Sequence, residues 1–407
     1  MIRTAAGPAT PPEPGGSPLA ASGTSVIVIG GGIVGLACAW WLQGRGHTVL
    51  LLDPAHRLAP GEPPGADPGP GEGPERSGSL AALGVLMADS FHRDRGRAWE
   101  LRQRSLELWS RWRHDLARRG HRVPYRSGVL LLAADGDEQE RLVALGARKR
   151  ALGLPLEPWD RRRLDQLEPG LPQPSLAGLH SGRDGQLDPG SALAALAADG
   201  RERGLTVRAE AAVALRPEGD GWRVELAGGG VERAAWVVLA AGSASGTLLE
   251  AAAGLAAGVN LGGDGGPRVL EPVLGQALEL ELDSPLPTHW PGAVVWRGIN
   301  LVPRPDLEGG RRLWLGATLE PGREADPDQL SGLRDLGGSA PAWLRQARVV
   351  RRWQGLRPRP VGRPAPLLEQ PAPGLLLASG HYRNGILLAP ASAAWVAEQI
   401  EARPSGA

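Results

Sequence analysis

Apolar and polar positions follow two different periods along this chain, and the change between them marks its first expected structural unit. Val26–Ile29 is a continuous apolar run, which is typical of a strand buried on both faces. Apolar positions then recur with helical spacing over Val34–Gln43, and a second apolar run covers Thr48–Leu52. The pattern therefore predicts strand, helix and strand in succession, the unit that builds a parallel sheet with covering helices.

The same reasoning predicts helices and strands over the rest of the chain. Helical spacing of apolar positions predicts helices at Arg97–Arg119, Glu138–Leu152, Asp188–Arg203 and Pro390–Ile400. Short apolar or alternating runs predict strands at Gly128–Ala133, Leu205–Arg208, Val213–Arg216, Trp222–Leu226, Trp236–Ala240 and Leu375–Leu377. Between Val273 and Leu319 strands and turns alternate, which is the pattern of an antiparallel sheet.

Segments of βαβ character lie at both ends and in the middle of the chain, with β-rich segments between them. This order predicts an α/β fold of two interleaved domains, a Rossmann-type nucleotide-binding domain and a substrate domain built on an antiparallel β-sheet. We assign residues 25–100, 177–250 and 345–400 to the first domain and residues 101–176 and 251–344 to the second. Two stretches rich in Pro and Gly are expected to be a disordered tail (1–24) and a flexible insertion (59–76).

The composition excludes several classes of function. The 407 residues carry a net charge of +1, so no electrostatic nucleic-acid partner is expected. The single cysteine, Cys38, excludes an internal disulfide and a cysteine-based metal cluster, and the eight scattered histidines give no reason to expect a metal. No apolar run approaches the ~18 residues of a membrane-spanning helix. We therefore expect a soluble, cytoplasmic protein without a membrane partner, and homo-oligomer formation stays open.

The glycines after the first strand have the spacing Gly30-x-Gly32-x-x-Gly35. In this spacing the first glycine allows a tight turn, the second lets backbone approach a pyrophosphate, and the third lets helix and strand pack closely. The phosphates then lie at the N-terminus of the helix, where N–H groups and the helix dipole favour negative charge. Asp53 ends the second strand, about 20 residues after Gly32, where a carboxylate accepts hydrogen bonds from an adenosine ribose. This unit is predicted to bind an adenine dinucleotide.

Three later segments extend this signature. Ser79–Leu86 is small and apolar, Val237–Ser245 (VVLAAGSAS) is a strand that opens into a glycine turn, and Leu375–Pro390 reads LLLASGHYRNGILLAP. With the glycine spacing, and in this order, these segments resemble the D-amino-acid oxidase family of FAD-dependent oxidoreductases. The last segment resembles the glycine oxidase branch in particular, as do WQGLRP at Trp353–Pro358 and LVPR at Leu301–Arg304.

The resemblance implies a cofactor and the residues that contact it. The cofactor would be FAD without a covalent link, because relatives with covalent flavin need a cysteine near the C-terminal part of the flavin domain and Cys38 lies in the first helix. Backbone amides after Gly380 would face the pyrimidine end of the flavin, and His381 would pack or lie at the flavin edge. The implied FAD contacts are Gly30, Gly32, Ile33, Val34, Gly35, Asp53, Ser79, Ala81, Ala82, Gly84, Val213, Ala241, Gly242, Gly380, Tyr382, Arg383, Asn384, Gly385 and Ile386.

Two arginines and an asparagine are the implied substrate-facing residues. A guanidinium matches a carboxylate with two parallel hydrogen bonds, and the resemblance implies that Arg357 and Arg383 bind the substrate carboxylate beside the flavin. Glycine oxidases have a tyrosine two residues before Val-Pro-Arg, where this chain has Asn300, and the lost hydroxyl puts glycine itself in doubt. Three tryptophans, each expected in the core or in the pocket wall, are Trp296, Trp314 and Trp353.

The resemblance implies oxidation of a small amino acid or amine. A hydride would pass from the substrate carbon to flavin N5, giving an imine or keto acid and ammonia, with O2 as electron acceptor and H2O2 as its product. In relatives the imine serves thiamine thiazole synthesis. Two alternatives stay open: a dehydrogenase that uses another acceptor, and a flavin-binding protein without catalysis. A nicotinamide-dependent dehydrogenase shares the glycine spacing but leaves the HYRNGILLAP segment unexplained.

Overall fold

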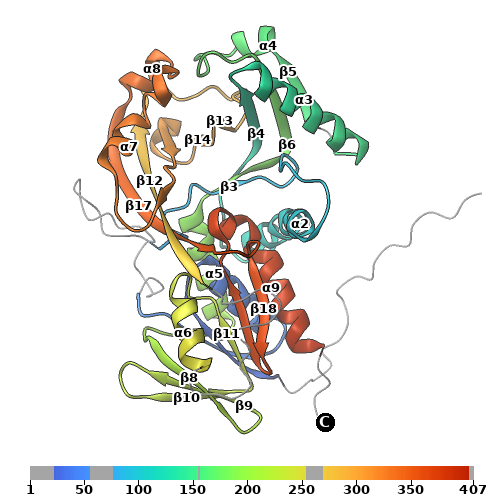
Figure 1. The fold of residues 1–407 in the computed structure, drawn as a ribbon, viewed down its shortest axis with the longest axis vertical. Helices are drawn as coiled ribbons and strands as arrows, with labels where there is room; N and C mark the ends of the chain where they lie inside the picture. Colours follow the sequence, from blue (N-terminus) through green and yellow to red (C-terminus); the bar gives the residue numbers. More distant parts are fainter. Residues whose placement is uncertain (1–22, 56–76, 155, 254–268, 403–407) are drawn as a thin grey trace, which may run out of the picture.

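The computed structural model describes residues 23–55, 77–154, 156–253 and 269–402. The insertion expected at 59–76 and nearly all of the tail expected at 1–24 lie outside these ranges. Within them, the fold is of the predicted α/β class, with a parallel sheet in the lower half of Figure 1 and a larger, mostly antiparallel sheet in the upper half.

The lower sheet has six strands in the order β18–β19–β11–β1–β2–β7, all parallel except β18. Their bounds are β1 Ser25–Ile29, β2 Thr48–Leu52, β7 Thr206–Arg208, β11 Trp236–Leu239, β18 Leu367–Ala372 and β19 Leu375–Ser379. The βαβ unit predicted at the N-terminus is therefore confirmed as β1, a helix and β2.

Both faces of this sheet are covered, which is why β1 is apolar at consecutive positions. Val26 and Val28 pack with helices on one face, whereas Ile27 and Ile29 pack with a small sheet and one helix on the other. The helices on the face of Val26 and Val28 are α1 Ile33–Gly44, α2 Arg97–Arg118, α5 Pro189–Glu202 and α9 Gly385–Glu401. The opposite face carries β8 Ala212–Glu218, β9 Gly221–Leu226, β10 Val231–Ala234 and α6 Ala244–Ala253.

The upper sheet confirms the antiparallel pattern predicted between Val273 and Leu319. Its strands run in the order β16–β12–β15–β14–β13–β4–β6–β3, with β17 beside β12 and β5 beside β6, and among these described strands only the β13–β4 pair is parallel. The bounds are β3 Val85–Leu86, β4 Tyr125–Ala133, β5 Leu156–Asp160, β6 Ala177–Leu187, β12 Leu270–Glu281, β13 Ala293–Trp296, β14 Ile299–Arg304, β15 Arg312–Gly316, β16 Glu320–Pro321 and β17 Arg348–Pro360.

Further helices lie along this upper sheet, and the chain alternates between the two halves (Figure 1). They are α3 Gly136–Ala151, α4 Arg161–Asp165, α7 Pro327–Gly332, α8 Ala342–Gln346 and the 3-10 turns η1 Glu308–Gly310 and η2 Leu336–Gly338. The 3-10 turn η3 Tyr382–Asn384 instead follows β19 of the lower sheet. The domain boundaries given above stay a prediction. No helix in the described ranges combines the length and apolar character needed to cross a membrane.

The start predicted for the last helix is wrong. Pro390 was expected to open it, but α9 begins at Gly385 and contains Pro390 in its interior. A proline inside a helix leaves the carbonyl four residues earlier without its usual donor. Here that carbonyl belongs to Ile386, and the indole N–H of Trp109 donates to it at 2.8 Å. A donor from α2 thus makes the interior proline tolerable.

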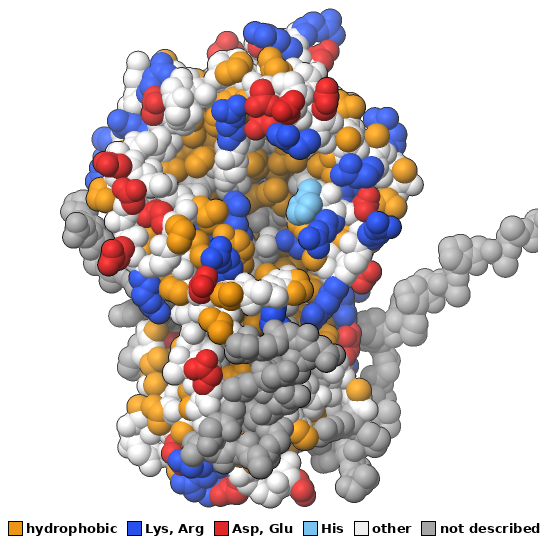
Figure 2. Space-filling view, in the orientation of Figure 1, with side chains coloured by type: hydrophobic (Ala, Val, Ile, Leu, Met, Phe, Trp, Pro, Cys, Tyr) orange, Lys and Arg blue, Asp and Glu red, His pale blue; other side chains and the backbone are white. Residues whose placement is uncertain are grey.

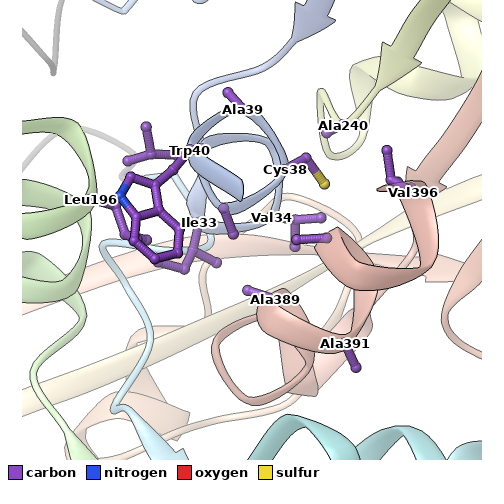
Figure 3. Close-up of a cluster of buried hydrophobic side chains, with 14 of the residues drawn as sticks. Ile33, Val34, Cys38, Ala39, Trp40, Leu196, Ala240, Ala389, Ala391 and Val396 are labelled. Atoms are coloured by element: carbon purple, nitrogen blue, oxygen red, sulfur yellow. The ribbon is translucent and has the colours of Figure 1, made fainter. Parts of the chain in front are cut away.

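The packing of α1 against α9 buries the single cysteine (Figure 3). Cys38 lies on α1 among Ala240, Val396 and other small apolar side chains. Burial raises the pKa of its thiol to about 12, so the thiolate that reacts with electrophiles is disfavoured.

Candidate active site

The glycine turn between β1 and α1 has open space at one position only. Gly30 has φ 107°, a left-handed value that favours glycine. A Cβ on Gly35 would overlap the carbonyl oxygen of Gly30, so this glycine is needed for the contact between helix and strand. A Cβ on Gly32 would meet only the hydroxyl of Ser79, at 3.2 Å. The space beside Gly32 is therefore available to a ligand.

Side chains from two other segments hold this turn. The two carboxylate oxygens of Asp53 accept hydrogen bonds from the N–H groups of Gly31 (2.5 Å) and Ala55 (2.8 Å). The hydroxyl of Ser79 accepts one from the N–H of Ile33 at 2.9 Å. Each carboxylate oxygen has more than one acceptor site, so the partly buried Asp53 holds the turn and keeps capacity for a ribose hydroxyl.

Two packed helices, α1 and α9, begin without a cap from their own N-cap side chains. The N-cap residues are Gly32 and Asn384, and neither side chain accepts a hydrogen bond from the first turn. Val34 of α1 and Ala389 of α9 belong to the buried cluster between these helices (Figure 3). N–H groups at such helix starts attract phosphate and other electron-rich groups. These residues fit the phosphates and the polar pyrimidine edge of a flavin dinucleotide.

The turns after β1, β11 and β19 meet at the carboxyl ends of three neighbouring strands. The hydroxyl of Ser379 donates to the carbonyl of Gly242 at 3.0 Å. The N–H of Ala240 donates to the carbonyl of Ile29 at 2.8 Å. In open α/β sheets ligands bind at this edge, so the predicted contacts Ala241, Gly242 and Gly380 are brought to the glycine turn of β1.

The segment before β3 joins the two sheets. The indole N–H of Trp353, on β17, donates to the carbonyl of Ala81 at 3.0 Å, and the N–H of Leu187 donates to the carbonyl of Gly84 at 3.0 Å. The predicted contacts Ser79 and Ala82 lie in this same connecting segment. Val213 differs, because it lies half exposed on β8 of the small sheet, and its contact with the cofactor stays a prediction.

The two predicted carboxylate-binding arginines come from different halves of the molecule. Arg357 is a partly buried residue of β17, whereas the exposed Arg383 lies in η3, after β19. Burial, together with the charge of Arg383, lowers the pKa of Arg357 to about 10. In the described part of the chain neither guanidinium forms an ion pair with a carboxylate. Two neighbouring cations without a direct ion-pair partner are suited to bind an anion.

Backbone carbonyls orient the guanidinium of Arg357, and a buried carboxylate lies behind them. Nη1 of Arg357 donates to the carbonyls of Leu274 (3.1 Å) and Thr318 (3.2 Å). Glu320 accepts hydrogen bonds from the Thr318 hydroxyl and from Nε2 of Gln276 at 3.0 Å. Its charge acts to raise the pKa of Arg357, against the effect of burial. Sequence reasoning missed this network, whose only signal was the polar pair of Thr318 and Glu320 after an apolar strand.

Asn300 lies on the β14–β15 ladder at the edge of this network. It faces Gly316, and its Nδ2 donates to the Gly316 carbonyl at 3.2 Å. Thr318 lies two residues after Gly316 in the sequence. The structure therefore brings the three predicted substrate-facing residues into one region, although the amide of Asn300 is engaged by backbone.

His381 packs inside the protein rather than facing solvent. Its Nε2 lies 2.8 Å from the hydroxyl of Ser392, which itself donates to the carbonyl of Leu388 at 2.9 Å. The imidazole Nε2 must then carry a proton and donate to Ser392. Burial lowers the pKa of His381 to about 3, so the ring is neutral at ordinary pH. Next to it, Tyr382 has φ 54° and lies close enough to Arg357 to affect its pKa.

A cavity of about 450 Å³ opens beside Arg383. The β13–β14 turn, the segment after β15, α7 and η2 bound it. In Figure 2 the upper half of the molecule is hollowed, with apolar side chains inside the hollow and charged side chains of both signs around it. Of the three tryptophans considered above, Trp296 lines the cavity, whereas Trp314 and Trp353 pack together in the core with ring centroids 5.4 Å apart.

Comparison with known proteins agrees with this arrangement. The model of the family described as "FAD dependent oxidoreductase" (DAO) matches residues 25–399. The chain belongs to this family. It is 28% identical to the glycine oxidase of Geobacillus kaustophilus (strain HTA426) over 92% of each chain. It is 27% identical to the bifunctional protein ThiO/ThiG of Nostoc sp. (strain PCC 7120 / SAG 25.82 / UTEX 2576), covering 92% of this chain and 52% of that protein.

Solved structures show the same fold. The glycine oxidase of Geobacillus kaustophilus superimposes with a TM-score of 0.77 and 25% identity, over 94% of this chain and 96% of that one. Iminodiacetate oxidase from Chelativorans sp. BNC1 superimposes with a TM-score of 0.76 at 19% identity, over the same shares. The DAO protein described here is thus an FAD-dependent oxidoreductase of the glycine oxidase type.

Proposed function

We propose that this DAO protein oxidises an amino acid whose carboxylate is bound between Arg357 and Arg383. The observation that carries the proposal is the pair of neighbouring guanidiniums without an ion-pair partner in the described residues, one of them in the turn after β19 that is predicted to contact FAD. The overall reaction converts the substrate amine to an imine, which hydrolyses to a keto or aldehyde acid and ammonia, with O2 reduced to H2O2. The names of the glycine oxidase relatives support this reaction class.

FAD, when bound, supplies the electron sink for a hydride from the substrate carbon. The residues of this chain then have the task of positioning. Arg357, oriented by the carbonyls of Leu274 and Thr318, presents its remaining N–H groups to the carboxylate. Holding the substrate in one orientation removes much of the entropic cost of the reaction. His381 is neutral and engaged with Ser392, so it is no acceptor for the amine proton, and the substrate reacts with its amine already neutral.

We also propose that the flavin is bound without a covalent link. Cys38 is the chain's only cysteine, and it lies buried between α1 and α9 with a raised pKa. Denaturation in acid followed by filtration should release all yellow colour from the protein. Colour that stays with the denatured chain would contradict this.

The test of the reaction is anaerobic reduction of the flavin. The purified yellow protein is mixed with glycine, sarcosine, D-alanine and larger amino acids, and bleaching of the visible flavin absorbance is recorded. Bleaching by at least one amino acid is expected. If no amino acid bleaches the flavin, the proposal fails. Mixing the reduced protein with O2 in a stopped-flow instrument then separates an oxidase from a dehydrogenase that uses another acceptor.

A further inference from the structure

The cavity beside Arg383 is continuous with the proposed carboxylate site. Arg383 itself lines the cavity. Thr318 also lines it, and the carbonyl of Thr318 accepts the hydrogen bond from Arg357. Ile299, a third lining residue, is the neighbour of Asn300. A carboxylate bound by the two arginines therefore borders this cavity on the side of Thr318 and Arg383.

The remaining wall of the cavity is largely apolar. Trp296, Leu333 and Leu336 are buried in its wall, and Leu319 contributes an exposed apolar side chain. Arg297 lines it too, but its charge is engaged by Asp135 at 3.0 Å and Glu138 at 3.6 Å. Among the described lining residues, Arg383 is thus the cation left to face a ligand.

The size of the cavity does not match the simplest substrate. Its volume of about 450 Å³ is within the ~300–1,000 Å³ of typical small-molecule sites. Glycine has no side chain, so it would contact the arginines and leave the apolar wall covered by water. Displacing water from apolar wall is favourable in proportion to the area covered.

We propose that this cavity receives an apolar substituent of the substrate, so that an amino acid with a branched aliphatic or aromatic substituent is preferred over glycine. The inference rests on the proposed function, because it assumes that the carboxylate lies between the two arginines. The substituent is carried by the α-carbon or by the nitrogen, and the chemistry recognised by the wall is the same in both cases.

The first test is a substrate series with the purified holoprotein. Glycine is compared with D-leucine, L-leucine and N-isobutylglycine, and kcat/KM is taken from the rate of flavin reduction. At least one leucine-shaped substrate is expected to exceed glycine by about tenfold or more, the discrimination that small apolar groups provide in a pocket. Glycine equal to or better than all three overturns the inference and leaves the proposed function intact. Absence of reduction by every amino acid rejects both.

The second test narrows the cavity. Gly332 lines it, and a Cβ there meets no heavy atom within 4 Å, so Gly332→Leu adds volume without a clash. The ratio of kcat/KM for the leucine-shaped substrate to that for glycine should fall about tenfold. The control is Gly136→Leu on α3, which also has open space but lies outside the cavity. An unchanged ratio in Gly332→Leu, with FAD absorbance and melting temperature retained, contradicts the inference.

A third test changes polarity and reads binding instead of turnover. Leu319 and Leu152 are almost equally exposed, at 49% and 48%, and only Leu319 lines the cavity. Perturbation of the flavin spectrum gives the Kd of 4-methylpentanoate and of acetate. Leu319→Asn should raise the Kd of 4-methylpentanoate several-fold relative to acetate, whereas Leu152→Asn should leave that ratio as in the wild type. Equal effects of the two variants would overturn the proposed subsite.

Discussion

The indole N–H of Trp109 donates to the carbonyl of Ile386 at 2.8 Å, in the first turn of α9. Pro390, four residues later, has no N–H for that carbonyl. The tryptophan of α2 thus replaces a helical hydrogen bond at the place where α9 meets the expected flavin.

Replacing Trp109 should cost more stability than replacing its neighbour. Trp109→Phe leaves the buried Ile386 carbonyl without a donor, which costs about 1–3 kcal/mol beyond the lost packing. Trp112 is as buried as Trp109, and its indole N–H has no partner in the described structure. Trp112→Phe is therefore the matched control, with urea denaturation of both variants as the measurement. Equal losses would show that the hydrogen bond contributes nothing.

Two glycines of the β1–α1 turn should separate cofactor binding from folding. A Cβ on Gly32 meets only the Ser79 hydroxyl, at 3.2 Å, so Gly32→Val should fold and lose FAD because the side chain takes the space of a phosphate. Gly35→Val should instead lose the fold, because its Cβ overlaps the Gly30 carbonyl. Circular dichroism and the flavin-to-protein absorbance ratio distinguish the two. A yellow Gly32→Val protein would refute the phosphate position.

The two arginines should be needed for substrate use and not for folding. Arg357→Ala and Arg383→Ala each remove a charged hydrogen-bond donor worth about 1.5–3 kcal/mol, which lowers kcat/KM by roughly 10–100-fold. FAD should stay bound in Arg357→Ala. Arg359 is the control, because it lies exposed on the same strand and pairs with Glu271 at 2.7 Å. If both alanine variants keep normal kcat/KM, the carboxylate lies elsewhere.

Glu320 should set the pH range of carboxylate binding. Arg357 is faced by Arg383, Tyr382 and Glu320, and because burial lowers its pKa to about 10 its binding of a carboxylate should weaken as pH rises toward that value. Glu320→Gln removes the neighbouring negative charge and should move this loss to lower pH.

The measurement is the Kd of acetate for the holoprotein between about pH 7 and pH 10.5. This range is wide enough to show the pKa shift of ~1 unit that removal of a single neighbouring charge produces. Glu324→Gln makes the same change at an exposed position of the same segment and serves as control. Identical pH profiles for the two variants would show that Glu320 does not act on Arg357.

His381 should make the protein less stable in acid. Its pKa in the folded protein is about 3, below the ordinary value of 6.5. Between these pH values the unfolded chain therefore binds a proton at His381 that the folded chain does not bind. Stability from this group is complete above pH 6.5 and falls as pH drops toward 3. His381→Gln should flatten the pH dependence of the unfolding free energy in this window, whereas His289→Gln, at an exposed position, should not. A slope unchanged by His381→Gln would exclude this group as its source.

The local pattern of apolar and polar residues predicted most of the fold. A strand buried on both faces, such as β1, is a continuous apolar run, and strands with one buried face, as in the upper sheet, alternate between apolar and polar residues. It failed at the start of α9, where Pro390 lacks the donor for the Ile386 carbonyl and Trp109, nearly 280 residues earlier in the chain, supplies it. The same limit applies to the site. Arg357 and Arg383 were identified by resemblance, but the polar network of Gln276, Thr318 and Glu320 arises from pairing between distant strands, and its only local signature is the polar pair of Thr318 and Glu320.

The placement of Arg357 and Arg383 on opposite halves has a consequence for how affinity is set. One guanidinium lies on a strand of the upper sheet and the other in the turn after β19, and the cavity wall of α7 and η2 belongs to the upper half. If both bind the carboxylate as proposed, the distance between the two halves should itself determine substrate affinity. Substitutions at the joint between them, such as the contact of Trp353 with Ala81, should tune the Kd of a carboxylate without touching any atom that binds it.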